Sequence, residues 1–373
     1  MSSDPGGTLR RTALHAVHKG LGAKMVDFGG WDMPVEYSGL IKEHMAVRTG
    51  VGLFDVSHMG EIDVRGPHAL DLVQRVTCND ASKLKIGQAH YTCLMYEHGT
   101  LADDLLCYRV ADDHFFLVVN ASNQDKDFAW ISENNTEIGA TLENNGDNYS
   151  LLAVQGPRVQ EVLKPITDAD LSSVKYYWFT HGKVGGIECR IARTGYTGED
   201  CFELFFAPEH SERMWTLLME AGKDAGMIPC GLGARNTLRL EAGMSLYGHE
   251  IDASHTPLEA GLDRYVKFDK GEYIGRAALA GQKEAGLKRK LVGIEMTGRG
   301  IGRDGYPIYA NDSEEAACGI VTSGSPAPFL KKNIALAYVP ADRSEVGREL
   351  WVGIRGQRVS AVIVPTPFYK RKK

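Results

Sequence analysis

Several common sequence features are missing from this chain, and each absence narrows the classes of protein to which it can belong. No apolar run approaches the ~18–20 residues that a membrane-spanning helix requires. The opening residues, MSSDPGGTLRRTALHAV, lack the apolar core of a secretory signal. The seven cysteines are odd in number and include no C-x-x-C pair, which disfavours a disulfide framework and a zinc knuckle. We therefore expect a protein of a reducing, cytoplasm-like compartment.

Basic charge and nucleotide-binding motifs are scarce as well. The formal net charge is −6, whereas a general nucleic-acid binder normally carries a basic stripe. The phosphate-binding pattern G-x-x-x-x-G-K-[ST] does not occur, and the glycine-rich stretches Gly231–Gly233 and Gly298–Arg303 lack the strand–helix spacing of a dinucleotide loop. Because G-x-S-x-G is also absent, Ser57 and His58 do not indicate a serine hydrolase.

Glycine is the one residue type in clear excess. The chain has 42 glycines among 373 residues, above the ~7% typical of globular proteins, which predicts many tight turns and close backbone approaches. The hydrophobic fraction of 43% and the charged fraction of 24% are those of an ordinary globular protein. The length predicts two or three domains of ~100–200 residues each.

The pattern of predicted helices and strands changes along the chain. The first part mixes helical stretches with strands at 91–96, 101–110 and 114–120, the last two joined by a turn of hairpin length. A second part returns to strands and helices without a fixed repeat period, and its predicted helix at 233–242 ends at Gly243. The polar segment 278–288 is expected to be a linker. The remaining strands predict a small all-β C-terminal domain, at 290–296, 334–339, 349–354 and 359–364.

Two adjacent aspartates, Asp103 and Asp104, stand within a predicted strand. Side chains alternate along a strand, so the two carboxylates are expected on opposite faces and not in one shared site. Either both are solvated near the strand end, or one lies in a cleft as an acid, a base or a stabiliser of cations. Strand alternation does not choose between these readings.

Three further charged residues are candidates for a binding site. Glu203 stands in an apolar strand, so it lies either at an exposed edge or buried with a partner, and its two oxygens suit a ligand with two parallel N–H donors. Arg235 and Arg239 are four residues apart on a predicted helix and share a face. They either form salt bridges with acids such as Glu241 or Glu250, or grip an anionic ligand.

A series of longer segments resembles one known family. They include Gly52-Leu-Phe-Asp-Val-Ser-His-Met59, Leu101-Ala-Asp-Asp-Leu105 and Arg193-Thr-Gly-Tyr-Thr-Gly-Glu-Asp200. Further matching segments are Leu9–Thr12, Gly22–Tyr37, Val118–Ser122, Gly233–Gly243, Leu246–Asp252, Thr256–Gly261, Tyr273–Arg276, Arg299–Tyr306, Thr322–Gly324 and Leu330–Pro340. All stand in the family's order between residues 8 and 371. The chain therefore resembles the glycine cleavage system T-protein, aminomethyltransferase.

The resemblance implies an α+β fold. Two intertwined N-terminal α+β lobes and a C-terminal all-β, barrel-like domain are expected around a central folate cleft. The folate-binding aminomethyltransferase region is expected at 1–280, with one lobe formed by 1–55 and 140–280 and the other by 56–139. The barrel is expected at 287–373.

It also implies an enzyme of glycine catabolism and one-carbon metabolism. Members of the family transfer the methylene of the aminomethyl group carried by lipoyl H-protein to tetrahydrofolate, which releases ammonia and forms 5,10-methylenetetrahydrofolate. The expected partners are lipoylated H-protein and folate, with no nucleic acid and no membrane. Tetrahydrofolate is expected as the acceptor substrate, and no metal, nicotinamide or pyridoxal phosphate is expected in this chain. The implied compartment is a prokaryotic cytoplasm, or the mitochondrial matrix of a eukaryote.

The resemblance assigns roles to single residues. Asp104 matches the second aspartate of the family's Asp-Asp pair, which implies a catalytic carboxylate that stabilises cationic carbon and nitrogen species, and Asp103 is then expected to be solvated. Residues implied to bind the folate are Tyr196 and Glu203 at the pterin, Arg235, Val118 and Asn120. Met59, Arg239, Arg303 and Arg371 are further matches, the last of them in a tail whose basic residues lie near the lipoyl entrance. Gly195 and Gly198 are expected to let the backbone turn sharply beside the folate.

The chain departs from the family's usual residues at two positions, and two alternative functions remain open. Asn236 stands where the family often has aspartate, and Tyr265 lies close to a usual tryptophan. One alternative function is a folate-dependent demethylase of the same family, a module often fused to oxidoreductase domains for which this chain has no room. The other is a non-catalytic, folate-binding maturation factor, whose distinctive lysine–cysteine–glycine segment is missing here.

Overall fold

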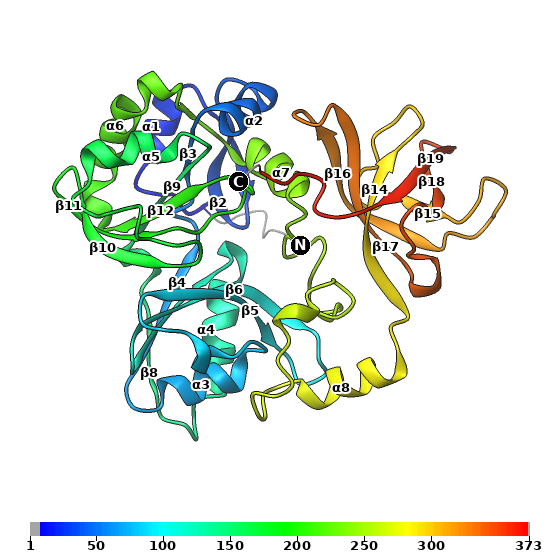
Figure 1. Ribbon diagram of the computed structural model, residues 1–373, viewed down its shortest axis with the longest axis horizontal. Coiled ribbons are helices and arrows are strands. Elements are labelled where there is room, and N and C mark those ends of the chain that lie inside the picture. The colour runs from blue at the N-terminus through cyan, green and yellow to red at the C-terminus, as the bar shows by residue number, and fades with distance from the viewer. Residues whose placement is uncertain (1–7, 372–373) are drawn as a thin grey trace.

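The computed structural model describes residues 8–371, so residues 1–7 and the tail residues Lys372 and Lys373 lie outside the described part. Two sheets and a barrel surround the middle of the molecule (Figure 1). The α-helices are α1 His15–Gly20, α2 Leu40–Thr49, α3 Ala69–Val76, α4 Gln124–Glu133, α5 Val159–Leu163, α6 Ser211–Ala221, α7 Leu232–Glu241 and α8 Arg276–Ala285.

The first sheet has five strands in the order β5-β6-β7-β4-β8. They are β4 Gly60–Arg65, β5 Gln88–Met95, β6 Leu101–Ala111, β7 His114–Val119 and β8 Thr141–Asn144. The expected hairpin is confirmed, because β6 and β7 pair antiparallel with Leu106 opposite Val118. Helices α3 and α4 cover one face; in α3, apolar side chains recur at the helical spacing and are fully buried, at Ala69, Leu72, Val73 and Val76.

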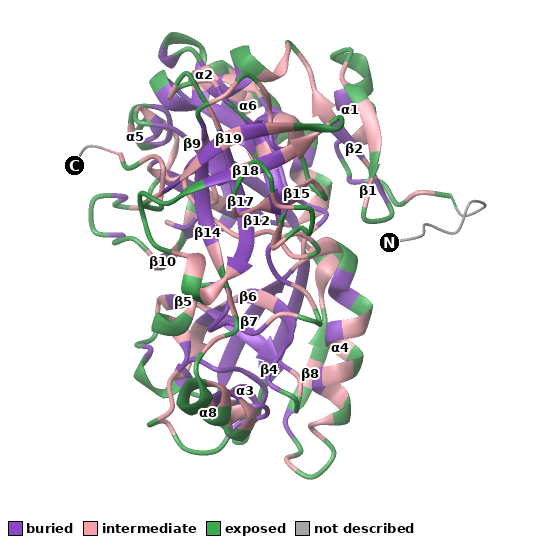
Figure 2. Cartoon of the chain, turned by 90° about the vertical axis from the view of Figure 1, so that its right-hand side faces the viewer, coloured by how far each residue is buried: buried purple, intermediate pink, exposed green. Residues whose placement is uncertain are grey.

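The second sheet has six strands in the order β10-β11-β12-β9-β3-β13. They are β3 Gly52–Asp55, β9 Ser150–Gln155, β10 Phe179–Val184, β11 Ile187–Ala192, β12 Cys201–Phe206 and β13 Ile228–Pro229. A separate hairpin consists of β1 Lys24–Phe28 and β2 Trp31–Glu36. Figure 2 shows that the sheet strands are largely buried, whereas the helices outside them are partly exposed.

The two sheets repeat one order of elements, although the sequence has no fixed repeat period. The strand β4, helix α3, strands β5, β6 and β7 and helix α4 correspond in turn to β9, α5, β10, β11, β12 and α6. The turn Gly66-Pro67 before α3 recurs as Gly156-Pro157 before α5. Few other residues are identical between the copies, so the repeat is visible in the order of strands and helices more than in the sequence.

The two copies meet edge to edge. Gln88 of β5 bridges Trp178, the amide of Ala89 donates to the Tyr177 carbonyl at 2.8 Å, and the amide of Phe179 donates to the Gly87 carbonyl at 2.8 Å. A shared apolar core fills the space between the sheets, and it includes Phe54, Tyr108, Phe116 and Phe205. The inner faces of both sheets therefore point toward each other.

The third part is a closed six-stranded barrel, which confirms the expected all-β C-terminal domain. Its order is β14-β17-β16-β15-β18-β19. The strands are β14 Arg289–Met296, β15 Pro307–Tyr309, β16 Gly319–Ala327, β17 Lys332–Pro340, β18 Glu349–Ile354 and β19 Gln357–Val364. After β19 the chain returns to α7, where the amide of Tyr369 donates to the Glu241 carbonyl at 2.7 Å (Figure 1).

The prediction of a linker at 278–288 is wrong. Most of this segment belongs to α8, which leads into the barrel (Figure 1). Leu279 is fully buried there, in the core of the five-stranded sheet. The polar composition reflects a helix whose other residues are exposed or only partly buried. Across residues 8–371, no helix is long and apolar enough to cross a membrane.

Candidate active site

A cavity of about 640 Å³ opens where the inner faces of both sheets, α7, the barrel and the C-terminal segment meet. Its wall includes the barrel residue Leu336 and the tail residues Thr366 and Pro367. Of the ten residues predicted for the site, the cavity is lined by Met59, Asp104, Val118, Asn120, Tyr196, Glu203 and Arg235. Segments far apart in the sequence thus place most of the predicted residues on one surface.

Asp104 lies on β6, and its carboxylate faces the cavity. Asn120, which follows β7, donates from Nδ2 to the Asp104 carboxylate at 2.9 Å and to its carbonyl at 3.0 Å. The hydroxyl of Tyr91 on β5 also donates a hydrogen bond to the carboxylate. Two neighbouring strands therefore fix the direction of this side chain.

The ionisation of Asp104 is shifted by its surroundings. Burial is the largest cause and the negative charge of Asp103 is the second, and together they raise the pKa of Asp104 to about 7, against the opposing hydrogen bonds from Tyr91 and Asn120. A carboxyl group with this pKa is divided between its two protonation states near neutral pH. Such a group is suited to proton transfer or to stabilising a cation that forms beside it.

Asp103 is not solvated, contrary to the expectation. Its side chain is fully buried on the helix-covered face of the sheet, alongside Leu105 and Cys107. The two aspartates do point to opposite faces, as alternation requires. They are nevertheless joined, because Nδ2 of Asn120 lies 2.8 Å from Asp103 Oδ1 as well as 2.9 Å from Asp104 Oδ1. Only Asp104 lines the cavity, so the two carboxylates do not share one site, but Asn120 links them.

The opposite wall of the cavity carries Glu203 on β12. The hydroxyl of Thr194 donates to its Oε2 at 2.5 Å. Burial raises the pKa of Glu203, and the charge of Arg235 acts in the other direction. A carboxylate held by one hydroxyl keeps acceptor positions for a ligand that offers paired N–H donors.

Arg235 and Tyr196 form a stacked pair beside Glu203. The Arg235 guanidinium lies 4.3 Å from the centre of the Tyr196 ring, and the Tyr196 hydroxyl donates to the Ser245 carbonyl. Within the described residues Arg235 takes part in no ion pair, and burial lowers its pKa. Its planar donors are therefore available to a ligand in the cavity.

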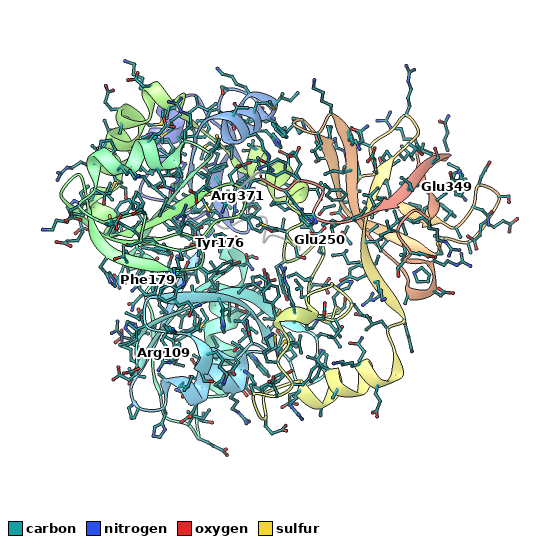
Figure 3. The ribbon with its side chains drawn as sticks, in the orientation of Figure 1. Arg109, Tyr176, Phe179, Glu250, Glu349 and Arg371 are labelled. Atoms are coloured by element: carbon teal, nitrogen blue, oxygen red, sulfur yellow. The ribbon has the colours of Figure 1, made fainter. Side chains whose placement is uncertain are left out.

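The other three predicted residues lie outside the cavity lining. Arg239 is buried and forms a salt bridge with Glu250 at 2.6 Å, which is the first of the two roles considered for it from the sequence. Arg303 is exposed on the barrel and donates to the Gly324 carbonyl at 3.2 Å. Arg371 pairs with Asp200 at 3.4 Å, and its guanidinium lies 5.9 Å from the Tyr176 ring; both residues lie toward the middle of the molecule in Figure 3.

Sequence reasoning missed three tyrosines of the site, because Tyr91, Tyr176 and Tyr177 line the cavity. Tyr265, which the sequence places close to a usual tryptophan of the family, also lines it, and its ring centre is 4.7 Å from that of Tyr91. Tyr91 has a detectable signal, since it lies in the strand that pairs with β6 and its ring can reach across to Asp104. Tyr176 and Tyr177 have no such signal in the sequence, because their position depends on the junction between the two sheets.

Asn236, which stands where the family often has aspartate, accepts a hydrogen bond from Arg239 at 2.9 Å.

The structure also tests the Ser57–His58 pair and the two glycines of the turn after β11. Asp55 bonds His18 at 2.8 Å and Thr12 at 2.7 Å, so it does not orient His58, and no Ser57–His58–Asp55 triad forms in the described chain. Gly198 has φ +81°, as a sharp turn requires. Gly195 has no positive φ; a Cβ there would lie 2.3 Å from Cys201 Sγ, so glycine allows close packing instead.

The described residues contain no group of three or more His, Cys, Asp or Glu side chains arranged to hold a metal ion. The cavity does offer two carboxyl groups on different sheets, a stacked arginine and a set of tyrosine rings. A flat, polar ring with paired N–H donors fits the wall at Glu203, and a centre that becomes positively charged fits beside Asp104.

Comparisons with known proteins agree with this architecture. Residues 14–270 match the family described as GCVT N-terminal domain, and residues 289–370 match the glycine cleavage T-protein C-terminal barrel domain. The aminomethyltransferase of Acidobacterium capsulatum is 56% identical over 377 residues, covering 100% of this chain and 99% of the relative. That of Koribacter versatilis is 53% identical, covering 98% and 97%. The crystal structure of glycine cleavage system aminomethyltransferase T from Bartonella henselae has a TM-score of 0.91 at 32% identity, covering 97% of this chain and 99% of that one.

Proposed function

The chain belongs to the glycine cleavage T-protein family of aminomethyltransferases, and from that premise we propose that it transfers the methylene of an aminomethyl group, carried by the lipoyl arm of H-protein, to tetrahydrofolate. The reaction releases ammonia and forms 5,10-methylenetetrahydrofolate and the dihydrolipoyl arm. One observation carries the proposal: Asp104 and Glu203, from two different sheets, line the same cavity.

Glu203 is proposed to bind the pterin ring. The ring presents an amide N–H beside an amino group, and a carboxylate accepts two parallel hydrogen bonds from such a pair. Thr194 holds one oxygen of Glu203 at 2.5 Å and thereby fixes the plane of the carboxylate. Tyr196 and Arg235 are proposed to flank the ring, because they are stacked on each other at the same wall.

Asp104 is proposed to act at the reacting atoms. Loss of ammonia from an S–CH2–NH3+ group, or its displacement by folate N5, develops positive charge on carbon and nitrogen. A carboxylate that is already oriented by Asn120 and Tyr91 stabilises this charge without reorganisation during the reaction. Val118 and Met59 provide apolar wall beside it, and Asn120 supports the carboxylate directly.

The lipoyl arm is proposed to enter beside the C-terminal segment. Thr366 and Pro367 line the cavity, and the guanidinium of Arg371 lies 5.9 Å from the ring of Tyr176, which also lines it. Tyr176 is 45% exposed, so its ring is accessible to an approaching chain. We further propose a reducing compartment, the cytoplasm, in which the seven free cysteines remain thiols.

The test is a folate-dependent release of ammonia. The purified protein is incubated with aminomethylated H-protein, with and without tetrahydrofolate, and ammonia is measured over time. We expect turnover only when both are present, and H-protein that lacks the lipoyl group serves as the control. Absence of ammonia release under saturating folate would remove the proposed reaction.

A further inference from the structure

A second buried acid lies behind Asp104. Asp127 on α4 is fully buried, and its carboxyl group is within hydrogen-bonding distance of the carboxyl group of Asp103. Both groups lie on the helix-covered face of the five-stranded sheet, away from the cavity. Two carboxylates so close and so far from water are not both ionised, so the pair shares a proton.

The hydrogen bonds show which of the two holds the proton. Asp103 accepts from the amide of Asn120 at 3.1 Å, from Nδ2 of Asn120 at 2.8 Å and from Nδ2 of Asn123 at 2.7 Å. In the described chain, neither oxygen of Asp127 accepts a hydrogen bond. A carboxylate with three donors keeps its charge, whereas one without donors does not. Asp127 is therefore the protonated partner, and it donates to Asp103.

The charged groups around the pair are compatible with this assignment. Nζ of Lys126 lies 3.0 Å from Asp127 Oδ1, but it also donates to the Ala102 carbonyl and lies 5.0 Å from the Tyr247 ring centre. Burial and the charge of Asp103 outweigh the lysine and raise the pKa of Asp127 to about 10. Other titratable groups that act on these aspartates are Tyr91 and Cys93 on β5, Tyr196 and Arg235 at the cavity wall, and Tyr247.

The cluster is connected to the cavity through one amide. Nδ2 of Asn120 bridges Asp103 Oδ1 at 2.8 Å and Asp104 Oδ1 at 2.9 Å. The order of contacts is therefore Asp127, Asp103, Asn120 and Asp104. Asp127 supports the charge and position of Asp103. Asp103 accepts the hydrogen bond that holds Asn120, and Asn120 in turn holds Asp104.

The second copy of the repeat shows that the fold itself does not need these acids. In α6, which corresponds to α4, the equivalent of Asp127 is Met214, and both are fully buried. In β11, which corresponds to β6, the equivalent of Asp103 is Ile187, also buried. An apolar pair fills the same place between helix and sheet. The acidic pair exists only in the copy that carries Asp104.

We propose that Asp127 and Asp103 are positioning residues of the aminomethyl transfer, in which the protonated Asp127 stabilises the charge of Asp103 and the pair, through Asn120, orients Asp104 and sets its charge. This inference rests on the proposed function for its kinetic consequence. It does not depend on that function for the hydrogen-bonded arrangement itself.

The test compares two substitutions of Asp127 that differ in one respect. Asp127→Asn keeps the shape and a donor toward Asp103, and we expect its kcat within about twofold of wild type. Asp127→Leu removes the donor, so Asp103 and, through it, Asn120 are held less firmly. For this variant we expect kcat to fall about tenfold or more with little change in the KM for folate.

A second variant and a substrate-free measurement keep the test decisive. Asp103→Asn is close in shape and removes the negative charge that raises the pKa of Asp104, so it should move the acid limb of the kcat profile about one pH unit lower, even if Asp127→Leu does not fold. A carbon-13 titration of the aspartate carboxyl groups, assigned with Asp104→Asn, reads the midpoint of Asp104 in the full-length protein without substrates. It should fall in Asp103→Asn and stay unchanged in Asp127→Asn.

Two outcomes would overturn the proposal. One is a wild-type acid limb and an unmoved Asp104 midpoint in Asp103→Asn. The other is the same kcat in Asp127→Asn and Asp127→Leu, which would indicate that a donor toward Asp103 has no role. Failure of the proposed function looks different, because the wild-type protein would then release no ammonia while the carboxyl titration of Asp103→Asn still decides whether Asp103 sets the charge of Asp104.

Discussion

At Asp104 one carboxyl group meets an amide, a phenol and the charge of a second carboxylate. The hydrogen bonds from Asn120 and Tyr91 favour its ionised form, whereas burial and Asp103 favour the neutral form. Burial and the charge of Asp103 have the larger effect, so the pKa of Asp104 is raised to about 7. A carboxylate that stabilises a cation must be ionised, so its charge is gained as the pH rises through this value.

The first prediction concerns this carboxylate. Asp104→Asn should leave folate binding almost unchanged, because the pterin is proposed to bind at Glu203, but it should lower turnover by about 10²–10⁴-fold. Ammonia release gives turnover, and calorimetry gives the folate Kd. A variant with wild-type turnover would contradict the catalytic assignment.

The pH dependence of the wild-type rate is a separate prediction. Protonation of Asp104 removes the negative charge, so kcat should fall on the acid side with a midpoint near the raised pKa of about 7. The ammonia assay at a series of pH values, with folate and H-protein saturating, measures this midpoint. A rate that is flat down to the ordinary pKa range of an aspartate would show that Asp104 is not the group that titrates.

Glu203 should govern affinity more than rate. Glu203→Ala removes two acceptor oxygens from the pterin wall, and we expect the folate Kd to rise about tenfold or more, since one charge-assisted hydrogen bond contributes about 1.5–3 kcal/mol. Titration calorimetry measures the Kd directly. Glu188→Ala is a suitable control, because Glu188 is an exposed glutamate of β11 that lies outside the cavity lining. An unaltered Kd for Glu203→Ala would remove this residue from the pterin site.

Among the elements, the junction between the two copies has the most specific backbone requirement. Gly87 before β5 has φ +86°, and its equivalent in the other copy, Tyr177 before β10, has φ +63°. The carbonyl of each accepts from the first strand of the other copy, at 2.8 Å in both cases. Tyrosine takes this left-handed conformation at an energetic cost, yet its ring lines the cavity.

This geometry yields a prediction with a built-in control. At Gly87 a Cβ has ordinary space, with the Phe179 carbonyl oxygen 3.5 Å away, so Gly87→Ala introduces only backbone strain and should lower the free energy of unfolding by about 1 kcal/mol. Gly281 lies within α8 with open space around it, so Gly281→Ala should raise the same quantity by about 0.5–1 kcal/mol. Urea unfolding measures both, and equal effects would contradict the strain at the junction.

Elements were predictable from the sequence where a local signal decides them. The β6–β7 hairpin, the helix that ends before Gly243 and four barrel strands follow from alternation, turn residues and spacing. The burial of Asp103 was not predictable, because it depends on Asn120, Asn123 and Asp127 arriving from another part of the chain. The helix α8 was missed because its polar faces resemble a linker and Leu279 is its one buried residue.

For the whole molecule, a buried ion pair of the N-terminal α+β part anchors the barrel through hydroxyl groups of β16. Arg239 on α7 pairs with Glu250 at 2.6 Å and donates to the Ser323 hydroxyl of β16 at 2.7 Å. Burial alone would raise the pKa of Glu250, but Arg239 and the hydroxyls of Ser323 and Thr322 hold it below its ordinary value. This contribution to stability is therefore present above the ordinary glutamate pKa, and it is lost as the pH falls through the lower folded-state pKa.

Removing one partner should be costly. Arg239→Leu leaves Glu250 buried and unpaired, so we expect the free energy of unfolding at neutral pH to fall by about 3–5 kcal/mol. The exposed Arg303, replaced by alanine, should change it by less than about 0.5 kcal/mol. Urea unfolding at several pH values checks both numbers. The deficit of Arg239→Leu should shrink in acid, where Glu250 is neutral, and a deficit that does not change with pH would exclude the unpaired charge as its cause.

The proposed reaction depends on the fate of one carbon atom. H-protein that carries a carbon-13 aminomethyl group is mixed with the enzyme and tetrahydrofolate, and the folate is analysed by mass spectrometry while ammonia is measured in parallel. We predict that the label appears in 5,10-methylenetetrahydrofolate in step with the ammonia released, and that Asp104→Asn slows both together. Label that stays on the lipoyl arm, or ammonia released without labelled folate, would contradict the account.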